Sequence, residues 1–146
     1  MNSRLRVKIK RIDKSLPLPK YETKGSVGFD ILARTSAKIK PKTVELISGN
    51  IVVKVPKGYG LFLFSRSSTP IKKGLLTPHG VGVLDQDYSG EEDEVKIQVY
   101  NFTGKLVKVD KGERIAQGVI LPVSIVNWFE VNKMSSKSRG GIGSTG

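Results

Sequence analysis

The sequence predicts an all-β protein folded as a jelly-roll-like β-barrel. Short apolar or apolar-alternating runs recur between turn signals rich in Gly, Pro and Asn, which is the pattern of many short strands. No window keeps apolar residues at the i, i+3, i+4 spacing of an amphipathic helix over three turns. The chain has 146 residues, so it suits one domain with a single core.

The first half of the chain supplies a series of short expected strands. Residues 5–12 alternate apolar and basic side chains, as a strand with one outward face does. The connector SLPLPKYETKGS at 15–26 carries two prolines and leads into the apolar segment GSVGFDILA at 25–33. Further strands are expected at 43–48, 51–55 and 61–64, and the polar segment SRSSTPIKKGL at 65–75 follows as a loop or short turn.

The stretch GVGVLDQDYSGEEDEVKIQVYN at 80–101 is the centre of the prediction. Its apolar arms at 81–83 and 95–99 flank a Gly-containing acidic turn, which predicts a β-hairpin. Strands at 106–109 and 115–121 follow, and residues 125–131 are expected to close the core with Trp128 and Phe129. The Gly-rich end has no core-forming pattern, so a domain of residues 1–133 is expected to carry a mobile arm of residues 134–146.

The composition narrows the classes of function. The chain has 25 Lys and Arg against 13 Asp and Glu, a net charge of +12 that attracts phosphate-bearing partners. Because it has no cysteine and His79 is its single histidine, a thiolate or His-rich metal site and a His-based triad are not expected. No apolar run approaches the roughly 20 residues of a membrane span. The start Met1-Asn2-Ser3-Arg4 does not lead into the apolar run of a signal peptide, so we expect a cytoplasmic protein without a membrane partner.

Two carboxylates occupy unusual places. Six of the 13 acidic residues fall between 85 and 94, and Asp85 ends the apolar run of Val83 and Leu84. A carboxylate in that position can be aimed into a cleft as a general base, although a solvated acidic turn is the alternative. Asp30 lies within the apolar segment at 25–33, where strands disfavour aspartate, so it has either a satisfied structural hydrogen bond or a role in a site.

Two polar segments could hold phosphate. Arg66 followed by Ser67 and Ser68 offers a forked cation beside hydroxyls and backbone donors, and a structural Ser-rich turn is the alternative. The glycines of the arm would let backbone N–H groups approach phosphate oxygens closely, and an unstructured terminus is the alternative there.

Five separated segments resemble, in order and spacing, the trimeric dUTPase family. They are GSVGFDILA at 25–33, SRSSTPIKKG at 65–74, GVGVLDQDYSG at 80–90, KGERIAQGVI at 111–120 and RGGIGSTG at 139–146. The resemblance implies a β-clip barrel of the dUTPase type, a homotrimer, and active sites that are each built from all three subunits. It also implies Mg²⁺-assisted hydrolysis of dUTP to dUMP and pyrophosphate, which limits uracil incorporation into DNA and supplies dUMP for dTMP synthesis.

The resemblance carries roles onto single positions. Asp85 would orient and deprotonate the attacking water, and Asp30 would hold Mg²⁺ through a bound water. The phosphates would be contacted from three segments by Arg66, Ser67, Ser68, Gln117, Arg139, Gly143, Ser144 and Thr145. Arg114 lies within a family motif but is expected to make a structural ion pair.

For the nucleoside, the resemblance places Tyr88 against the deoxyribose, where it leaves no room for a 2′-hydroxyl. Backbone groups around Val83, Leu84 and Lys96 would contact the uracil edge.

Two positions depart from the family pattern. Ile142 stands where the family carries an aromatic residue that stacks on uracil, so weaker closure or slower turnover is expected. His79 stands where many relatives have a residue such as Asn, and it either contacts the base or serves as a structural turn residue.

Three alternative functions are weighed. A dCTP deaminase of the same superfamily would need a glutamate in the strand that reads VKIQVYN here. A non-catalytic barrel that binds nucleic acid would need aromatic groups such as Tyr59, Tyr88 and Tyr100 interleaved with a basic stripe, which the sequence lacks, so nucleic acid is not expected as a partner. A degenerate relative kept for regulatory protein contacts is suggested by Ile142 alone.

Overall fold

The computed structural model describes residues 4–146, and the expectation about a signal peptide falls partly on residues 1–3, outside this range. The strands are β1 (Lys8–Arg11), β2 (Phe29–Leu32), β3 (Ala37–Ile39), β4 (Val44–Ser48), β5 (Ile51–Lys54), β6 (Tyr59–Phe64), β7 (Leu75–Leu76), β8 (Gly82–Leu84), β9 (Lys96–Asn101), β10 (Val107–Val109) and β11 (Arg114–Pro122). The helix α1 (Thr69–Lys73) has five residues, and within residues 4–146 no helix is long and apolar enough to cross a membrane. The all-β prediction is confirmed.

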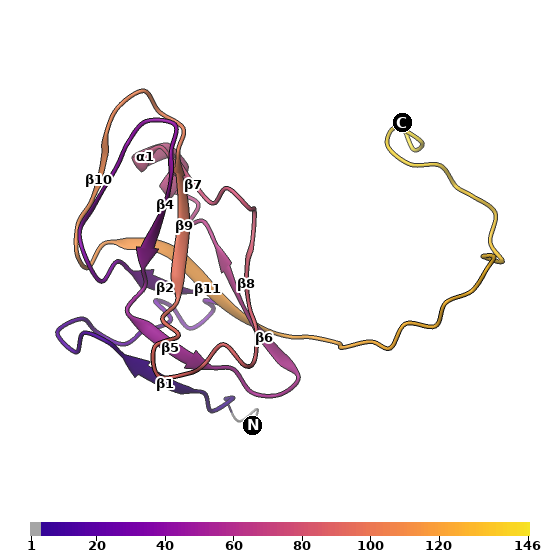
Figure 1. Cartoon of the computed structure of the whole chain (residues 1–146), viewed down its shortest axis with the longest axis horizontal. Helices are drawn as coiled ribbons and strands as arrows, with labels where there is room; N and C mark the ends of the chain where they lie inside the picture. Colours follow the sequence, from indigo (N-terminus) through magenta and orange to yellow (C-terminus); the bar gives the residue numbers. More distant parts are fainter. Residues whose placement is uncertain (1–3) are drawn as a thin grey trace.

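The strands form antiparallel sheets around one core (Figure 1). The largest sheet has the order β2-β11-β6-β8, the second has the order β4-β9-β7, and β1 pairs with β5 as β10 does with β3. Neighbouring strands are far apart in sequence, as β11 is from both β2 and β6. Such long connections are typical of a jelly-roll-like barrel rather than an up-and-down meander.

The core is built from the inward-facing residues of these strands. The largest fully buried apolar side chains are Ile31, Ile39, Ile47, Ile51, Leu61, Leu75, Val95, Val109 and Ile115. Each such burial stabilises the fold by roughly 1.5–3 kcal/mol. At the centre of the largest sheet, a Cβ on Gly118 would lie 2.7 Å from a ring carbon of Phe29, so glycine allows this ring to cover β11.

The predicted hairpin at 80–101 is wrong in its pairing. Both arms are strands, but β8 pairs with β6, and β9 lies between β4 and β7. Alternation predicts that a segment is a strand and which of its faces is buried, but it does not identify the neighbouring strand. The long connection at 85–95 lets each arm join a different sheet.

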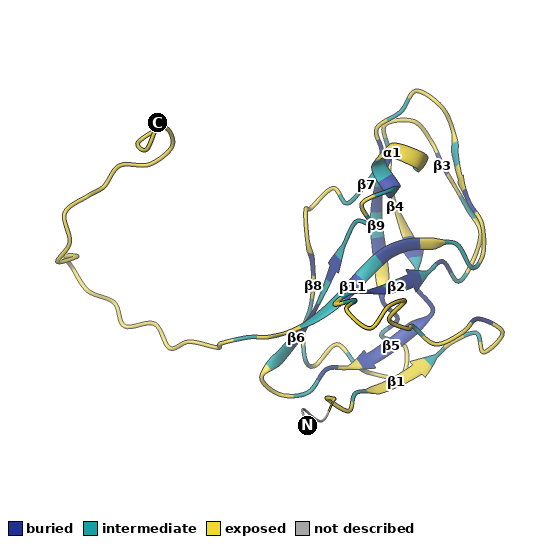
Figure 2. Cartoon of the chain, turned by 180° about the vertical axis from the view of Figure 1, so that it is seen from behind, coloured by how far each residue is buried: buried dark blue, intermediate teal, exposed yellow. Residues whose placement is uncertain are grey.

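The expectation that residues 125–131 close the core is also wrong. The amide of Val123 still donates to the carbonyl of Gly58 at 2.9 Å, but beyond it the chain runs away from the barrel (Figure 1). This segment is exposed (Figure 2), with Trp128 93% and Phe129 89% accessible. Trp128 and Phe129 therefore take no part in the core, which the strands of the barrel build without them.

Candidate active site

A small cavity lies beside β8 and gathers most of the predicted nucleoside contacts. Its volume is about 210 Å³, and it is lined by Leu63, His79, Gly82, Val83, Leu84, Asp85, Tyr88 and Lys96. The fold therefore brings the two arms at 81–83 and 95–99 to one cavity although they do not pair. The position of His79 in the lining leaves a base contact open to it.

Asp85 is the first residue after β8, and its side chain is exposed to solvent at the cavity. The turn that presents it is held at two points. The backbone carbonyl of Asp85 accepts a hydrogen bond from the Tyr88 amide at 3.2 Å, and the side-chain amide of Gln86 donates to the Tyr59 carbonyl at 2.9 Å. The structure thus presents a carboxylate on a fixed strand end, as general-base chemistry requires.

The acidic turn also contains a buried carboxylate that the sequence analysis did not single out. Glu94 is 5% exposed, and its carboxylate lies 2.7 Å from Arg34 Nε and 3.0 Å from Lys96 Nζ. It also accepts from the Asn50 amide at 2.9 Å, while its own carbonyl accepts from the Tyr88 hydroxyl at 2.9 Å. Glu94 therefore ties two cavity residues to the barrel. Its one signal in the sequence is its place directly before the alternating run at 95–99.

The environment of Glu94 has a clear electrostatic effect. Burial by itself raises the pKa of the Glu94 carboxyl, but hydrogen bonds from Arg34, Lys96 and the Asn50 amide outweigh it and lower the pKa from 4.5 to about 2. The hydrogen bond to Glu94 in turn raises the pKa of the Arg34 guanidinium.

The substitution Glu94→Gln tests this network through stability. Because the folded pKa lies below the unfolded one, the stabilisation is complete above about pH 4.5 and is lost as the pH falls towards 2. The shift corresponds to about 3 kcal/mol, so Glu94→Gln should lose about that much at pH 7, and the difference from wild type should vanish near pH 2. Urea unfolding between these pH values measures it. Glu92→Gln, at an exposed position two residues away, is the control that should change little.

The predicted phosphate and metal residues form a second cluster. Arg66 Nε lies 2.8 Å from Asp30 Oδ1, and the side-chain amide of Gln117 donates to the Ser65 carbonyl at 3.1 Å. Gln117 on β11 is directly opposite Asp30 on β2. A Cβ on Gly28 would lie 2.7 Å from Gln117 Oε1, so the glycine of the segment at 25–33 leaves room for this amide.

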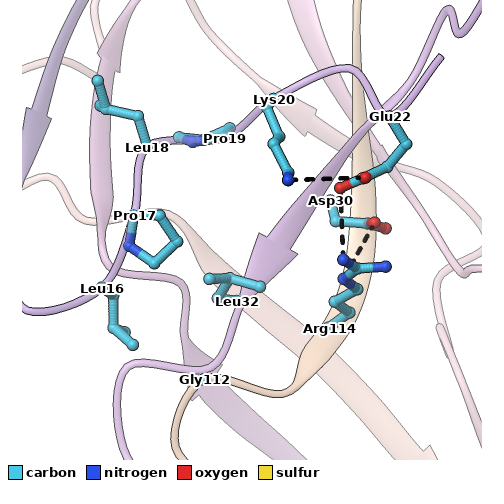
Figure 3. A pocket seen from close by; sticks show the side chains of 10 residues that line it. All are labelled: Leu16, Pro17, Leu18, Pro19, Lys20, Glu22, Asp30, Leu32, Gly112 and Arg114. Atoms are coloured by element: carbon cyan, nitrogen blue, oxygen red, sulfur yellow. Dashed lines mark hydrogen bonds and ion pairs between the residues drawn. The ribbon is translucent and has the colours of Figure 1, made fainter.

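Arg114 makes the ion pairs expected of it. Its Nε lies 3.6 Å from Asp30 Oδ2 and its Nη2 lies 3.4 Å from Glu22 Oε1, as Figure 3 shows. These groups line a cavity of about 260 Å³ between the connector at 15–26 and β2. Asp30 is thus oriented from two sides, by Arg66 and Arg114.

The remaining predicted contacts are not engaged within the barrel. Ser68 precedes α1, but its hydroxyl oxygen accepts no capping hydrogen bond from the first turn, and Ser67 is exposed. The arm residues lie on the extended segment away from both clusters (Figure 2), and they are Arg139, Ile142, Gly143, Ser144 and Thr145. Their roles, including the effect of Ile142, stay predictions.

Asp85 follows β8 and Asp30 lies on β2, which are the two edge strands of the largest sheet. Leu84 pairs with Leu61 of β6, so Asp85 lies in the same row as Gly60. Asp30 pairs with Gln117, and Gln117 pairs with Phe64 of β6, so Asp30 lies in the row of Phe64. The row difference of four residues corresponds to about 13 Å, and the three steps from β8 to β2 correspond to about 14 Å. Measured along the sheet, these spacings place Asp85 about 20 Å from Asp30 of the same chain, too far for both to act on one phosphate.

The donors of the second cluster suit a hydrated Mg²⁺ better than a closed metal cage. Within residues 4–146 no group of three or more His, Cys, Asp or Glu side chains could enclose an ion. Mg²⁺ keeps several waters and is commonly bound by one or two carboxylates together with substrate phosphates. A carboxylate such as Asp30, already accepting from Arg66, fits the role of an acceptor from a metal-bound water.

Comparisons with known proteins agree with these observations. A family model described as dUTPase matches residues 14–146. The chain is 37% identical to the deoxyuridine 5'-triphosphate nucleotidohydrolase of Lactococcus lactis over 88% of this chain and 87% of the relative, and 35% identical to that of Helicobacter pylori strain P12 over 97% of each. The crystal structure of a dUTPase from Streptococcus mutans is similar with a TM-score of 0.75 and 31% identity, covering 82% of this chain and 98% of that one.

Proposed function

The chain belongs to the dUTPase family, and from this premise we propose how it hydrolyses dUTP to dUMP and pyrophosphate: Asp85 of one subunit acts on a triphosphate held by the Asp30–Arg66–Gln117 cluster of another. The observation that carries the proposal is the division of the site, because Asp85 follows one edge strand of the largest sheet and Asp30 of the phosphate cluster lies on the other.

The chemical step follows from the groups at hand. The Asp85 carboxylate accepts a proton from a water molecule while the oxygen of that water forms a bond to the α-phosphorus. The bond between this phosphorus and the oxygen that bridges to the β-phosphorus breaks, which releases pyrophosphate. The products are dUMP and pyrophosphate. Positioning of the water beside the phosphorus and stabilisation of the phosphate charge supply most of the rate.

The phosphates are held by cations and by neutral donors. Arg66 and Gln117 supply a guanidinium and an amide, Ser67 donates to the leaving side of the scissile linkage, and the arm adds Arg139 and its backbone N–H groups. When bound, Mg²⁺ would neutralise part of the triphosphate charge, with Asp30 accepting from one of its waters.

The cavity beside β8 takes the nucleoside. The Tyr88 hydroxyl is held by the Glu94 carbonyl, so the ring is fixed where it can pack against deoxyribose and exclude a ribose. Backbone groups around Val83 and Lys96 are available for the uracil edge at the same cavity. A 210 Å³ cavity is small, which suits a single base and sugar rather than a polymer.

A homotrimer supports this arrangement. Cyclic symmetry lets Asp85 of each subunit face the phosphate cluster of the next, so that three equivalent sites form. The exposed apolar segment at 125–131, with Trp128 and Phe129, gives each subunit a surface to pack on a neighbour, and the arm at 134–146 can then close over a site.

Pyrophosphate release from dUTP, dCTP, dTTP and UTP in the presence of Mg²⁺ tests the assignment. We expect rapid release from dUTP and at least about 10²-fold less from the other three. A tight pocket has no room for a 2′-hydroxyl or a 5-methyl group, and the 4-amino group of cytosine places a donor where uracil has an acceptor, which leaves a polar group of the site unpaired. Ammonia released from dCTP would instead indicate the deaminase alternative, although β9 itself carries no carboxylate.

A further inference from the structure

The fold gathers six exposed lysines at one end of the barrel. They come from three distant segments of the sequence, and we call them the lysine surface: Lys38, Lys40, Lys42, Lys72, Lys105 and Lys108. The loops between β3 and β4 and between β9 and β10 lie at this end together with α1, whereas β1 and β5 lie at the opposite end (Figure 1). No stripe of this kind is visible in the sequence, because the lysines are separated by up to 70 positions.

Contacts between the three segments hold the lysine surface together. Lys38 on β3 is directly opposite Lys108 on β10. The ammonium of Lys73, on α1, donates to the Lys108 carbonyl at 2.7 Å, and that of Lys42 donates to the Phe102 carbonyl. These links join α1 to β10 and the loop after β3 to the loop after β9.

The positive charge of this surface is not neutralised by the chain. Within residues 4–146, no carboxylate oxygen lies within 4 Å of any of the six ammonium groups. Of the nearby acids, Glu113 pairs with Lys73 at 2.8 Å, and Asp110 and Glu45 are exposed but unpaired. Like charges directly opposite each other, as Lys38 and Lys108 are, destabilise strand pairing, so a polyanion that bridges them would relieve a repulsion.

We propose that the lysine surface binds the phosphate backbone of duplex nucleic acid, without sequence preference and apart from the nucleotide site. Lysine is a point charge on a flexible stem and suits backbone contacts better than base recognition. Single strands are held largely by stacking on several aromatic rings, and the lysine surface has Phe102, 37% exposed, at its edge. The chemistry therefore fits a duplex better than a single strand, and it revises the expectation that nucleic acid is not a partner.

Fluorescence anisotropy with a labelled 20-base-pair duplex tests the proposal on the full chain. For six phosphate contacts, affinity should fall about 10³-fold between about 50 and 200 mM salt. The variant Lys38→Gln/Lys40→Gln/Lys108→Gln should bind at least about tenfold more weakly at the lower salt, and its log–log salt slope should be smaller by about 3.

The matched control removes the same charge from the opposite end. Lys8→Gln/Lys14→Gln/Lys54→Gln changes three exposed lysines, of which Lys8 and Lys54 are also directly opposite each other. This control should retain the wild-type affinity and slope, and both triple variants should hydrolyse dUTP normally. Equal losses in the two variants would overturn the proposal, because binding would then follow net charge. Absence of duplex binding at low salt, or tighter binding to single-stranded DNA or to phosphatidylserine vesicles, would overturn it as well.

Discussion

Asp85→Asn is expected to lower kcat for dUTP by about 10² to 10⁴-fold, the contribution typical of a general base. Asparagine keeps the shape of the side chain and can still hydrogen-bond a water, but it cannot accept the proton. The KM should change little because the proposed partner of Asp85 is the attacking water rather than the nucleotide. Asp85 is exposed after β8, so stability should be preserved. Pyrophosphate release under saturating dUTP measures the effect.

Asp87→Asn is the control for this experiment. Asp87 is an exposed acid two residues further along the same turn and lies outside the lining of the 210 Å³ cavity. We expect its kcat to stay close to wild type. A loss in Asp87→Asn as large as that in Asp85→Asn would show that the turn acts through its charge, and normal turnover in Asp85→Asn would remove Asp85 as the base.

Deletion of residues 134–146 is expected to lower kcat/KM by about 10² to 10³-fold, the effect of losing hydrogen-bond donors to a developing phosphate charge. These residues are exposed along their whole length, so the melting temperature of the ligand-free protein should not change. Nucleotide turnover and a thermal melt on the same preparation measure both quantities.

A point substitution locates the effect of the arm. Arg139→Ala should reproduce part of the loss, whereas Lys137→Ala, which removes an equal charge two residues earlier, should not. Equal effects from the two would mean that the arm attracts the substrate by its overall charge and that Arg139 makes no specific contact with the phosphates.

Secondary structure was predictable from the sequence where the pattern within one segment is enough to determine it. The alternation of apolar and polar residues in β9 and the apolar run in β6 reflect which faces of these strands are buried. The sequence alone therefore predicts both strands. Pairing was not predictable, because the partners of β8 and β9 are chosen by the whole barrel. The prediction for residues 125–131 failed for a related reason. Nothing within residues 4–146 covers their apolar side chains, so composition alone could not place them.

The sequence motifs marked the segments that the fold brings together in the candidate site, but they did not predict its geometry. The pairing of Asp30 with Arg66, and the cavity shared by Asp85 and Tyr88, join residues whose segments the sequence motifs already marked. The separation of the two clusters and the buried Glu94 depend on sheet order and on long-range contacts, which no local pattern encodes.

Mixing two inactive variants tests the divided site most directly. Each variant, Asp85→Asn or Arg66→Ala, should be inactive when it is expressed alone. The two variants are then co-expressed with different tags, and the assemblies that carry both tags are purified. If Asp85 and Arg66 of one site come from neighbouring subunits of a trimer, each mixed trimer has one intact site in three, so the purified mixed assemblies should recover about one third of wild-type activity. If mixed assemblies form and no activity returns, Asp85 and Arg66 of each site belong to the same chain, and the account of a site shared between subunits is wrong.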